Sequence, residues 1–156
     1  LKKNLTYKKF ITHSIISDNQ ISKQIKELLK LNELDIKIYE KVSNLKPKFI
    51  GNCDVIFSVG YLKKIESEII KNFEIINLHP SLLPKYKGLM THKRMLINKE
   101  NKYGYSIHKV TKYLDDGEIL SQYQKNIYTS SENELSFNHK QLEHQRVFKD
   151  LVNFLD

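Results

Sequence analysis

The chain has 156 residues, 40% of them hydrophobic, which suits one folded domain, 1–156, and excludes a disordered tail. No apolar run reaches the roughly 18–20 residues of a membrane span, and the basic start at Leu1 leads into no secretory apolar stretch. Cys53 is the single cysteine, so an internal disulfide and a thiolate zinc site are both excluded. We therefore expect a cytoplasmic protein without a membrane partner.

The formal net charge of +8 at pH 7 raises the question of a nucleic-acid partner. Lysine supplies almost all of the positive charge, since Arg94 and Arg146 are the only arginines. The lysines are scattered and form no stripe with interleaved aromatic residues, whereas arginine is the usual residue for bidentate phosphate recognition. We expect no nucleic-acid partner. The alternative, a basic nucleic-acid-binding domain, predicts strongly salt-dependent binding of DNA or RNA.

Apolar runs alternate with segments of helical period along the chain. In chain order we expect a strand at 10–16, a helix at 21–31, strands at 34–39 and 53–59, a helix at 62–72, a strand at 73–78, a short helix at 91–98, strands at 105–110 and 119–127, and a closing helix at 132–155. The nearly continuous apolar run 53–59 is typical of a strand covered on both faces. This order predicts an α/β fold, with an open, mostly parallel, Rossmann-like sheet flanked by helices.

Polar residues follow the strand expected at 73–78, at the edge of the sheet where such folds bind ligands. Asn77 and His79 are two residues apart and so share one face of an extended chain. Pro80, Pro84 and Gly88 stiffen the loop that follows, as suits a site whose geometry is held in advance. Taken alone, a histidine at a strand end is more often structural than catalytic.

A second polar segment runs from Thr111 to Gly117 and contains two adjacent carboxylates, Asp115 and Asp116. Carboxylates beside a glycine are typical of a simple turn. A carboxylate close to an imidazole, in contrast, raises the pKa of the ring, fixes its tautomer and stabilises its charged form. The residues by themselves leave both interpretations open.

The run from Asn77 to Pro84, followed by Gly88, resembles the signature loop of folate-dependent formyltransferases. Among these it is most similar to the glycinamide ribonucleotide formyltransferases, which carry nearly the run found here from Lys85 to His92. The likeness covers about residues 10–155. It implies the formyltransferase fold, and a cis peptide bond at Leu83–Pro84.

The family places its catalytic aspartate in a Leu-Asp-x-Gly turn, which here contains Asp115. The separation of 38 residues from Asn77 to Asp115 needs no gap against the family pattern. The resemblance therefore implies that Asn77, His79 and Asp115 are the catalytic residues.

Further site residues follow from weaker parts of the same resemblance. The folate-binding residues that it implies are Tyr61, Leu62, Lys63, Thr111 and Leu114. The implied substrate-binding residues are Lys140 and Glu143, at the phosphoribosyl end of the substrate, and His108, which matches a histidine near the site. His92 also matches by position but is interpreted as a helix-surface residue, and His139 is expected to have no catalytic role.

The implied reaction is formyl transfer from 10-formyltetrahydrofolate to the amine of glycinamide ribonucleotide, a step of de novo purine biosynthesis. Attack of the amine on the formyl carbon gives a tetrahedral intermediate with a negative oxygen and a positive nitrogen. Asn77 can donate its amide N–H to that oxygen, and a protonated His79 adds charge stabilisation. Asp115 holds His79 and assists proton loss from the nitrogen. The substrates are small molecules, no metal is needed, and we expect a monomer or a homodimer.

One part of the family pattern is missing. Glycinamide ribonucleotide formyltransferases begin with a strand and a Gly/Ser/Asn-rich phosphate loop. This sequence has no such loop, and its strand at 10–16 resembles the second strand of the family. Either a segment is missing before Leu1, or the protein binds its amine differently. The alternatives are formyl transfer to another amine, such as an amino sugar, and an inactive truncated remnant that binds folate.

Overall fold

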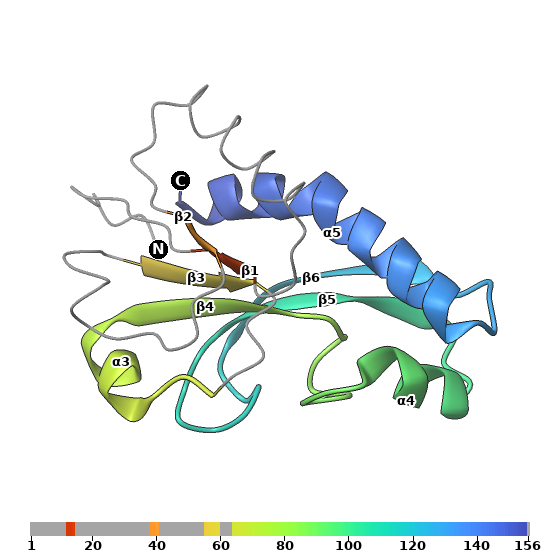
Figure 1. The fold of residues 1–156 in the computed structure, drawn as a ribbon, viewed down its shortest axis with the longest axis horizontal. Helices are drawn as coiled ribbons and strands as arrows, with labels where there is room; N and C mark the ends of the chain where they lie inside the picture. Colours follow the sequence, from red (N-terminus) through yellow and green to blue (C-terminus); the bar gives the residue numbers. More distant parts are fainter. Residues whose placement is uncertain (1–11, 15–37, 41–54, 60–63, 156) are drawn as a thin grey trace. The chain divides into compact units, whose positions relative to one another are not determined.

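The computed structural model describes residues 12–14, 38–40, 55–59 and 64–155. The chain divides into two compact units, one of residues 1–77 with residue 156 and the other of residues 78–155. The strands are β1 Thr12–Ser14, β2 Ile38–Glu40, β3 Val55–Val59, β4 Glu74–His79, β5 Lys102–Lys109 and β6 Ile119–Asn126 (Figure 1). The helices are α3 Ser67–Asn72, α4 Thr91–Ile97 and α5 Glu132–Leu155.

In the first unit, β1 and β2 form a parallel pair in which Thr12 lies opposite Ile38. Strand β1 also lies beside β3. All five residues of β3 are buried, which confirms for 55–59 the prediction of a strand covered on both faces. The helix expected at 21–31 lies outside the described residues.

The larger sheet has the strand order β3-β4-β5-β6. Strands β5 and β6 form an antiparallel hairpin that starts with Lys102 opposite Asn126 and ends with His108 opposite Ile119. Six consecutive residues of β5 are buried, whereas most of β6, the edge strand, is exposed. The loop that closes this hairpin is the one in which the sequence places Asp115.

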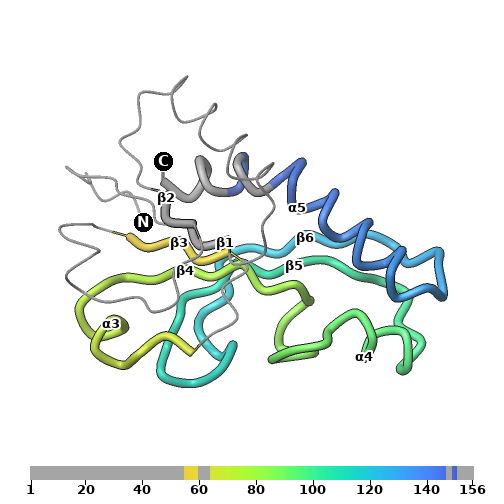
Figure 2. The backbone as a smooth tube through the Cα atoms, in the orientation of Figure 1, coloured from red at the N-terminus to blue at the C-terminus, as the bar shows by residue number. Residues whose placement is uncertain are grey.

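Helix α5 packs against α4 and β5 in the second unit, and Figure 2 follows the chain from β4 through α4 into the hairpin. Its start at Glu132 has a local cause, because the Ser131 Oγ accepts a hydrogen bond from the Glu134 N–H at 3.3 Å. Leu135 and Leu142 are buried on the face that α5 turns to the core. The helix bounds therefore match the prediction of 132–155.

The predicted α/β class is confirmed, and among the described elements the starts of β5 and α3 differ most from the predicted bounds. Strand β5 begins three residues before the predicted 105, because Gly104 is a close-approach residue and not a break. A Cβ at Gly104 would lie 1.9 Å from the carbonyl oxygen of Tyr123 on β6. Helix α3 begins at Ser67, later than the predicted 62, because Lys64 to Glu66 have no regular structure.

Two further observations concern earlier expectations. The peptide bond Leu83–Pro84 is cis, as the resemblance implied. Among the described residues, no helix combines the length and the apolar character that crossing a membrane requires.

Candidate functional site

His79 is the last residue of β4, and its side chain is only 7% exposed. Its Nδ1 lies 3.3 Å from the Asp115 Oδ2, and its Nε2 lies 2.9 Å from the carbonyl oxygen of Tyr86. Carbonyl and carboxylate oxygens are acceptors only, so a neutral ring can donate to one of them and a doubly protonated ring to both. Both ring nitrogens of His79 therefore face hydrogen-bond acceptors.

Asp115 lies in the β5–β6 loop with a φ of +46°, a left-handed conformation that aspartate tolerates better than most residues. Its Oδ2 accepts the backbone N–H of Gly88 at 2.8 Å in addition to facing His79. Its Oδ1 lies 3.6 Å from the Nε2 of His108. The carboxylate is thus held between two imidazoles and a backbone donor, with 10% of the side chain exposed.

His108 lies on β5 and its side chain is 2% exposed. Its Nδ1 faces the carbonyl oxygen of Lys109 at 3.0 Å and must be the donor in that contact. Burial lowers the pKa of His108, against smaller opposing effects of the Lys109 carbonyl and the Asp115 charge. The ring is therefore neutral at pH 7, with its N–H at Nδ1. We call His79, His108 and Asp115 the strand cluster.

Hydrogen bonds to Ser106 on β5 fix the loop after β4. The Ser106 Oγ donates to the Ser81 carbonyl at 2.6 Å and accepts the Leu83 N–H at 2.9 Å. Gln122 on β6 donates to both the Leu83 carbonyl, at 2.7 Å, and the Ser106 Oγ, at 2.9 Å. The loop that carries the signature run is thereby bonded to the same hairpin that carries Asp115.

The β5–β6 loop is in turn closed by a glycine. A Cβ at Gly117 would lie 1.7 Å from the Lys109 carbonyl oxygen, so no larger residue fits without a shift of the backbone. Lys87 pairs with Asp116 across the two loops. Tyr113 and Leu114 at the tip are 61% and 71% exposed, which leaves an apolar rim beside the buried Asp115.

A second group of ionisable side chains lies between α4 and α5. The His92 Nε2 is 2.9 Å from the His139 Nδ1, and the His139 Nε2 is 3.1 Å from the Glu143 Oε1. The second contact has ion-pair distance without straight hydrogen-bond geometry. We call His92, His139 and Glu143 the helix cluster. His139 is 1% exposed and His92 is partly buried, so the interpretation of His92 as a plain helix-surface residue is wrong.

The other predicted residues fall into four groups. Asn77 lies on β4 two residues before His79, at the last position of the first unit. Tyr61, Leu62 and Lys63 lie outside the described residues. Thr111 and Leu114 belong to the β5–β6 loop, where the Thr111 Oγ1 accepts the Tyr113 N–H at 3.2 Å. Lys140 is exposed on α5, one helical turn before Glu143.

Sequence reasoning missed three residues that build the site, namely Gly88, Ser106 and Gln122. Gly88 has a φ of +82°, and its N–H donates to the Asp115 carboxylate, so its role goes beyond stiffening a loop. Ser106 had a signal, because it is a polar residue two positions from His108 and therefore on the same face of the strand. Gln122 had none.

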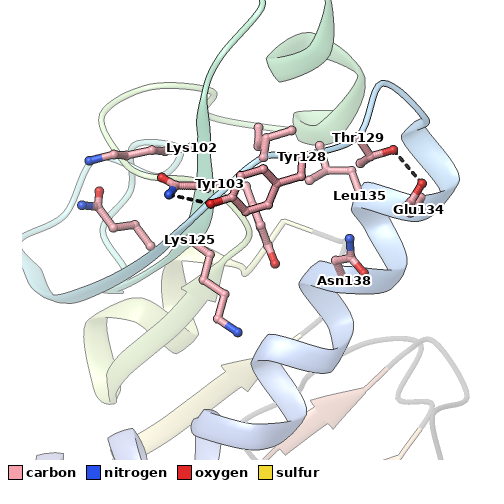
Figure 3. Close-up of a pocket in the computed structure, with 11 residues that line it drawn as sticks. Lys102, Tyr103, Lys125, Tyr128, Thr129, Glu134, Leu135 and Asn138 are labelled. Atoms are coloured by element: carbon pink, nitrogen blue, oxygen red, sulfur yellow. Dashed lines mark hydrogen bonds between the residues drawn. The ribbon is translucent and has the colours of Figure 1, made fainter.

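The cavity shown in Figure 3 has a volume of about 530 Å³ and lies at the other end of the hairpin. Lys102 and Asn126, which pair at that end, line it together with Tyr128 and with Asn138 of α5. Asp115 lies in the loop at the opposite end. The cavity is therefore separate from the strand cluster.

Comparisons with known proteins find matches to one family. Residues 13–151 match the Formyl transferase family. Over 71 residues the chain is 38% identical to the phosphoribosylglycinamide formyltransferase of Escherichia coli (strain K12), which covers 44% of this chain and 34% of the relative. Over 115 residues it is 36% identical to the bifunctional polymyxin resistance protein ArnA of Wigglesworthia glossinidia brevipalpis, which covers 72% of this chain and 17% of the relative.

Solved structures extend the likeness to the fold. The formyltransferase PseJ from Anoxybacillus kamchatkensis, in complex with UDP-4,6-dideoxy-4-formamido-L-AltNAc and tetrahydrofolate, has a TM-score of 0.68 at 25% identity, covering 88% of this chain and 73% of PseJ. The curated relatives are much longer than the segments matched here, which span about a third of the first and under a fifth of the second.

Proposed function

The chain belongs to the Formyl transferase family, and from this premise we propose that it transfers a formyl group from 10-formyltetrahydrofolate to the amine of glycinamide ribonucleotide. The observation that carries the proposal is the contact of His79 with Asp115, 3.3 Å apart and almost fully buried. A buried imidazole whose two nitrogens both face acceptors is a ready source of positive charge and of protons. Formyl transfer to an amine needs both.

In this reaction a carbon–nitrogen bond forms between the acceptor amine and the formyl carbon, and the bond from that carbon to the folate nitrogen breaks. Negative charge develops on the formyl oxygen, which we assign to Asn77 and His79, on one face of β4. The acceptor nitrogen loses a proton, which Asp115 takes up directly or through water. The folate nitrogen gains one as it leaves, so no net proton is consumed.

The formyl donor is a substrate consumed in each turnover, and the described loop fits it. Its aromatic ring needs apolar contact next to groups that read its polar edge. The exposed side chains of Tyr113 and Leu114 provide the apolar contact, and backbone groups between Thr111 and Asp115 provide hydrogen bonds to the polar edge. We therefore assign Thr111 and Leu114 to the donor, together with Tyr61, Leu62 and Lys63 by sequence.

The acceptor is assigned from the other side of the site. Lys140 and Glu143 lie one turn apart on α5, so a cation and a carboxylate are close enough to bind one sugar phosphate. We place the phosphate at Lys140 and the ribose hydroxyls at Glu143. His108, neutral and facing Asp115, is assigned to the reacting end of the acceptor. In this assignment the protein acts in purine biosynthesis.

A two-acceptor assay tests the proposal. With 10-formyltetrahydrofolate and glycinamide ribonucleotide, we expect formylated ribonucleotide and tetrahydrofolate to appear in equal amounts. The matched reaction contains a UDP-linked 4-amino sugar, the acceptor class indicated by the ligand bound to PseJ, and we expect no product above background. Turnover with the amino sugar alone would replace the acceptor and keep the reaction. Absence of turnover with both would reject the proposed reaction.

A further inference from the structure

The helix cluster places a histidine between a second histidine and a carboxylate. Among the described residues, no group of three or more His, Cys, Asp or Glu side chains is arranged to hold a metal ion, so its contacts must be explained by protons. His139 is the central member, and its ring also lies 5.8 Å from the ring of Tyr103 on β5. It is therefore enclosed by both helices and the sheet.

The hydrogen-bond contacts of the helix cluster allow two arrangements of protons on its ring nitrogens. The Glu143 carboxylate only accepts, so the His139 Nε2 facing it carries a proton. The His139 Nδ1 then either accepts the His92 N–H, with His139 neutral, or donates to His92, with His139 charged. Burial, aided by the charges of His139 and Lys140, lowers the pKa of His92 to about 4. His92 is therefore neutral at pH 7 in both arrangements.

The His139 Nδ1 is thus hydrogen-bonded to His92 of α4, and the His139 Nε2 lies at ion-pair distance from Glu143. The Glu143 side chain is 14% exposed, which leaves its carboxylate within reach of a ligand. A free glutamate loses rotamer freedom when it binds, at a cost of roughly 1–2 kcal/mol. A glutamate already held by a buried ring loses less, and so binds its ligand more tightly.

We propose that His92 and His139 are positioning residues that hold Glu143 ready to accept hydrogen bonds from hydroxyl groups of the amine acceptor. The proposal rests on the proposed function, in which Glu143 binds the sugar part of that acceptor. The position of Lys140 supports it, because its charge acts on His92 and so lies near the same cluster. A hydroxyl-bearing anion matches the resulting pair of fixed carboxylate and cation.

Steady-state kinetics with glycinamide ribonucleotide as the varied substrate tests the positioning role. We expect His139→Leu to raise the KM for the ribonucleotide about tenfold, while kcat and the KM for 10-formyltetrahydrofolate stay within twofold. His139→Gln, whose amide N–H can still reach the carboxylate, should keep the increase below about threefold. The double variant H139L/E143Q should be no worse than E143Q, because both changes remove one interaction. The exposed Gln141→Ala is the matched control on α5.

A separate measurement guards against misfolding of the buried variant. In ¹⁵N spectra of the histidine rings at pH 7, Glu143→Gln should shift the signals of His139 and leave those of His79 unchanged. Unshifted His139 signals would overturn the proposal, as would an effect of H139L on kcat equal to that on the ribonucleotide KM, or additive losses in the double variant. If the wild-type chain transfers formyl groups normally but H139L has no effect, only the positioning role fails. If the wild-type chain transfers none, the proposed function fails and this role with it.

Discussion

The strand cluster and the helix cluster contain the same kinds of side chain, two histidines and one carboxylate, but in a different order. In the strand cluster the carboxylate of Asp115 lies in the centre, and its two rings are each fixed from outside by a backbone carbonyl. In the helix cluster a histidine, His139, lies in the centre and the carboxylate of Glu143 is at the accessible end.

This difference separates two uses of the same chemistry. A central carboxylate between two fixed rings can gain or lose a proton while the rings keep their places, as proton transfer requires. A terminal carboxylate held by a central ring keeps its charge and its direction, as recognition requires. We therefore expect changes in the strand cluster to affect kcat, and changes in the helix cluster to affect the KM of the acceptor.

Replacing the central carboxylate should give the largest effect. Asp115→Asn keeps the size of the side chain but removes the charge that His79 and His108 both face. We expect kcat to fall about 10³-fold, within the range for a general acid or base, and the KM for either substrate to change little. Single-turnover formyl transfer measures the chemical step directly.

The matched control is the adjacent carboxylate. Asp116 is more than half exposed and pairs with Lys87, so Asp116→Asn should change kcat by less than about threefold. Equal losses in the two variants would mean that the loop needs negative charge in general, and the contrast between central and terminal carboxylates would lose its basis.

The next effect concerns the loop that holds Asp115. Gly117→Ala places a Cβ against the Lys109 carbonyl, so the backbone must move and we expect a loss of about 2–3 kcal/mol in unfolding free energy. Gly88→Ala makes only an ordinary van der Waals contact, 3.7 Å from the Leu114 Cδ2, but must adopt a left-handed φ, at a cost of about 1 kcal/mol. Urea unfolding followed by circular dichroism gives both values. A larger loss for Gly88 than for Gly117 would contradict the close-approach argument.

The sequence predicted the strand cluster better than the helix cluster, for a physical reason. Asn77 and His79 alternate on one strand, and Asp115 belongs to a turn with a glycine, so each has a local signal. His92 and His139 are 47 residues apart on two helices, and no local period shows that the two rings meet. The start of β5 at Lys102 could not be predicted for a similar reason. Gly104 lies within this strand because of its close approach to the backbone of β6, which no local pattern shows.

The last predicted effect is a pH dependence of stability that comes from the helix cluster. The pKa of His92 is about 4 in the folded chain, below its ordinary value of 6.5, mainly because the ring is buried. Between these values the unfolded chain binds more protons than the folded chain, so stability is lost as the pH falls from 6.5 to 4. The shift corresponds to about 3 kcal/mol at most, and solvent screening of this partly exposed ring reduces our expectation to about 2 kcal/mol.

His92→Gln isolates this contribution, because glutamine cannot take up the proton yet can still donate an N–H to the His139 Nδ1. We expect the difference in unfolding free energy, variant minus wild type, to rise by about 2 kcal/mol between pH 7 and pH 4. Lys93→Gln, an exposed change on the same helix, should show no such rise. A flat difference for His92→Gln would mean that the ring accepts a proton in the folded state without cost. His92 would then not be held neutral, and the helix cluster would lose the fixed geometry that distinguishes it from the strand cluster.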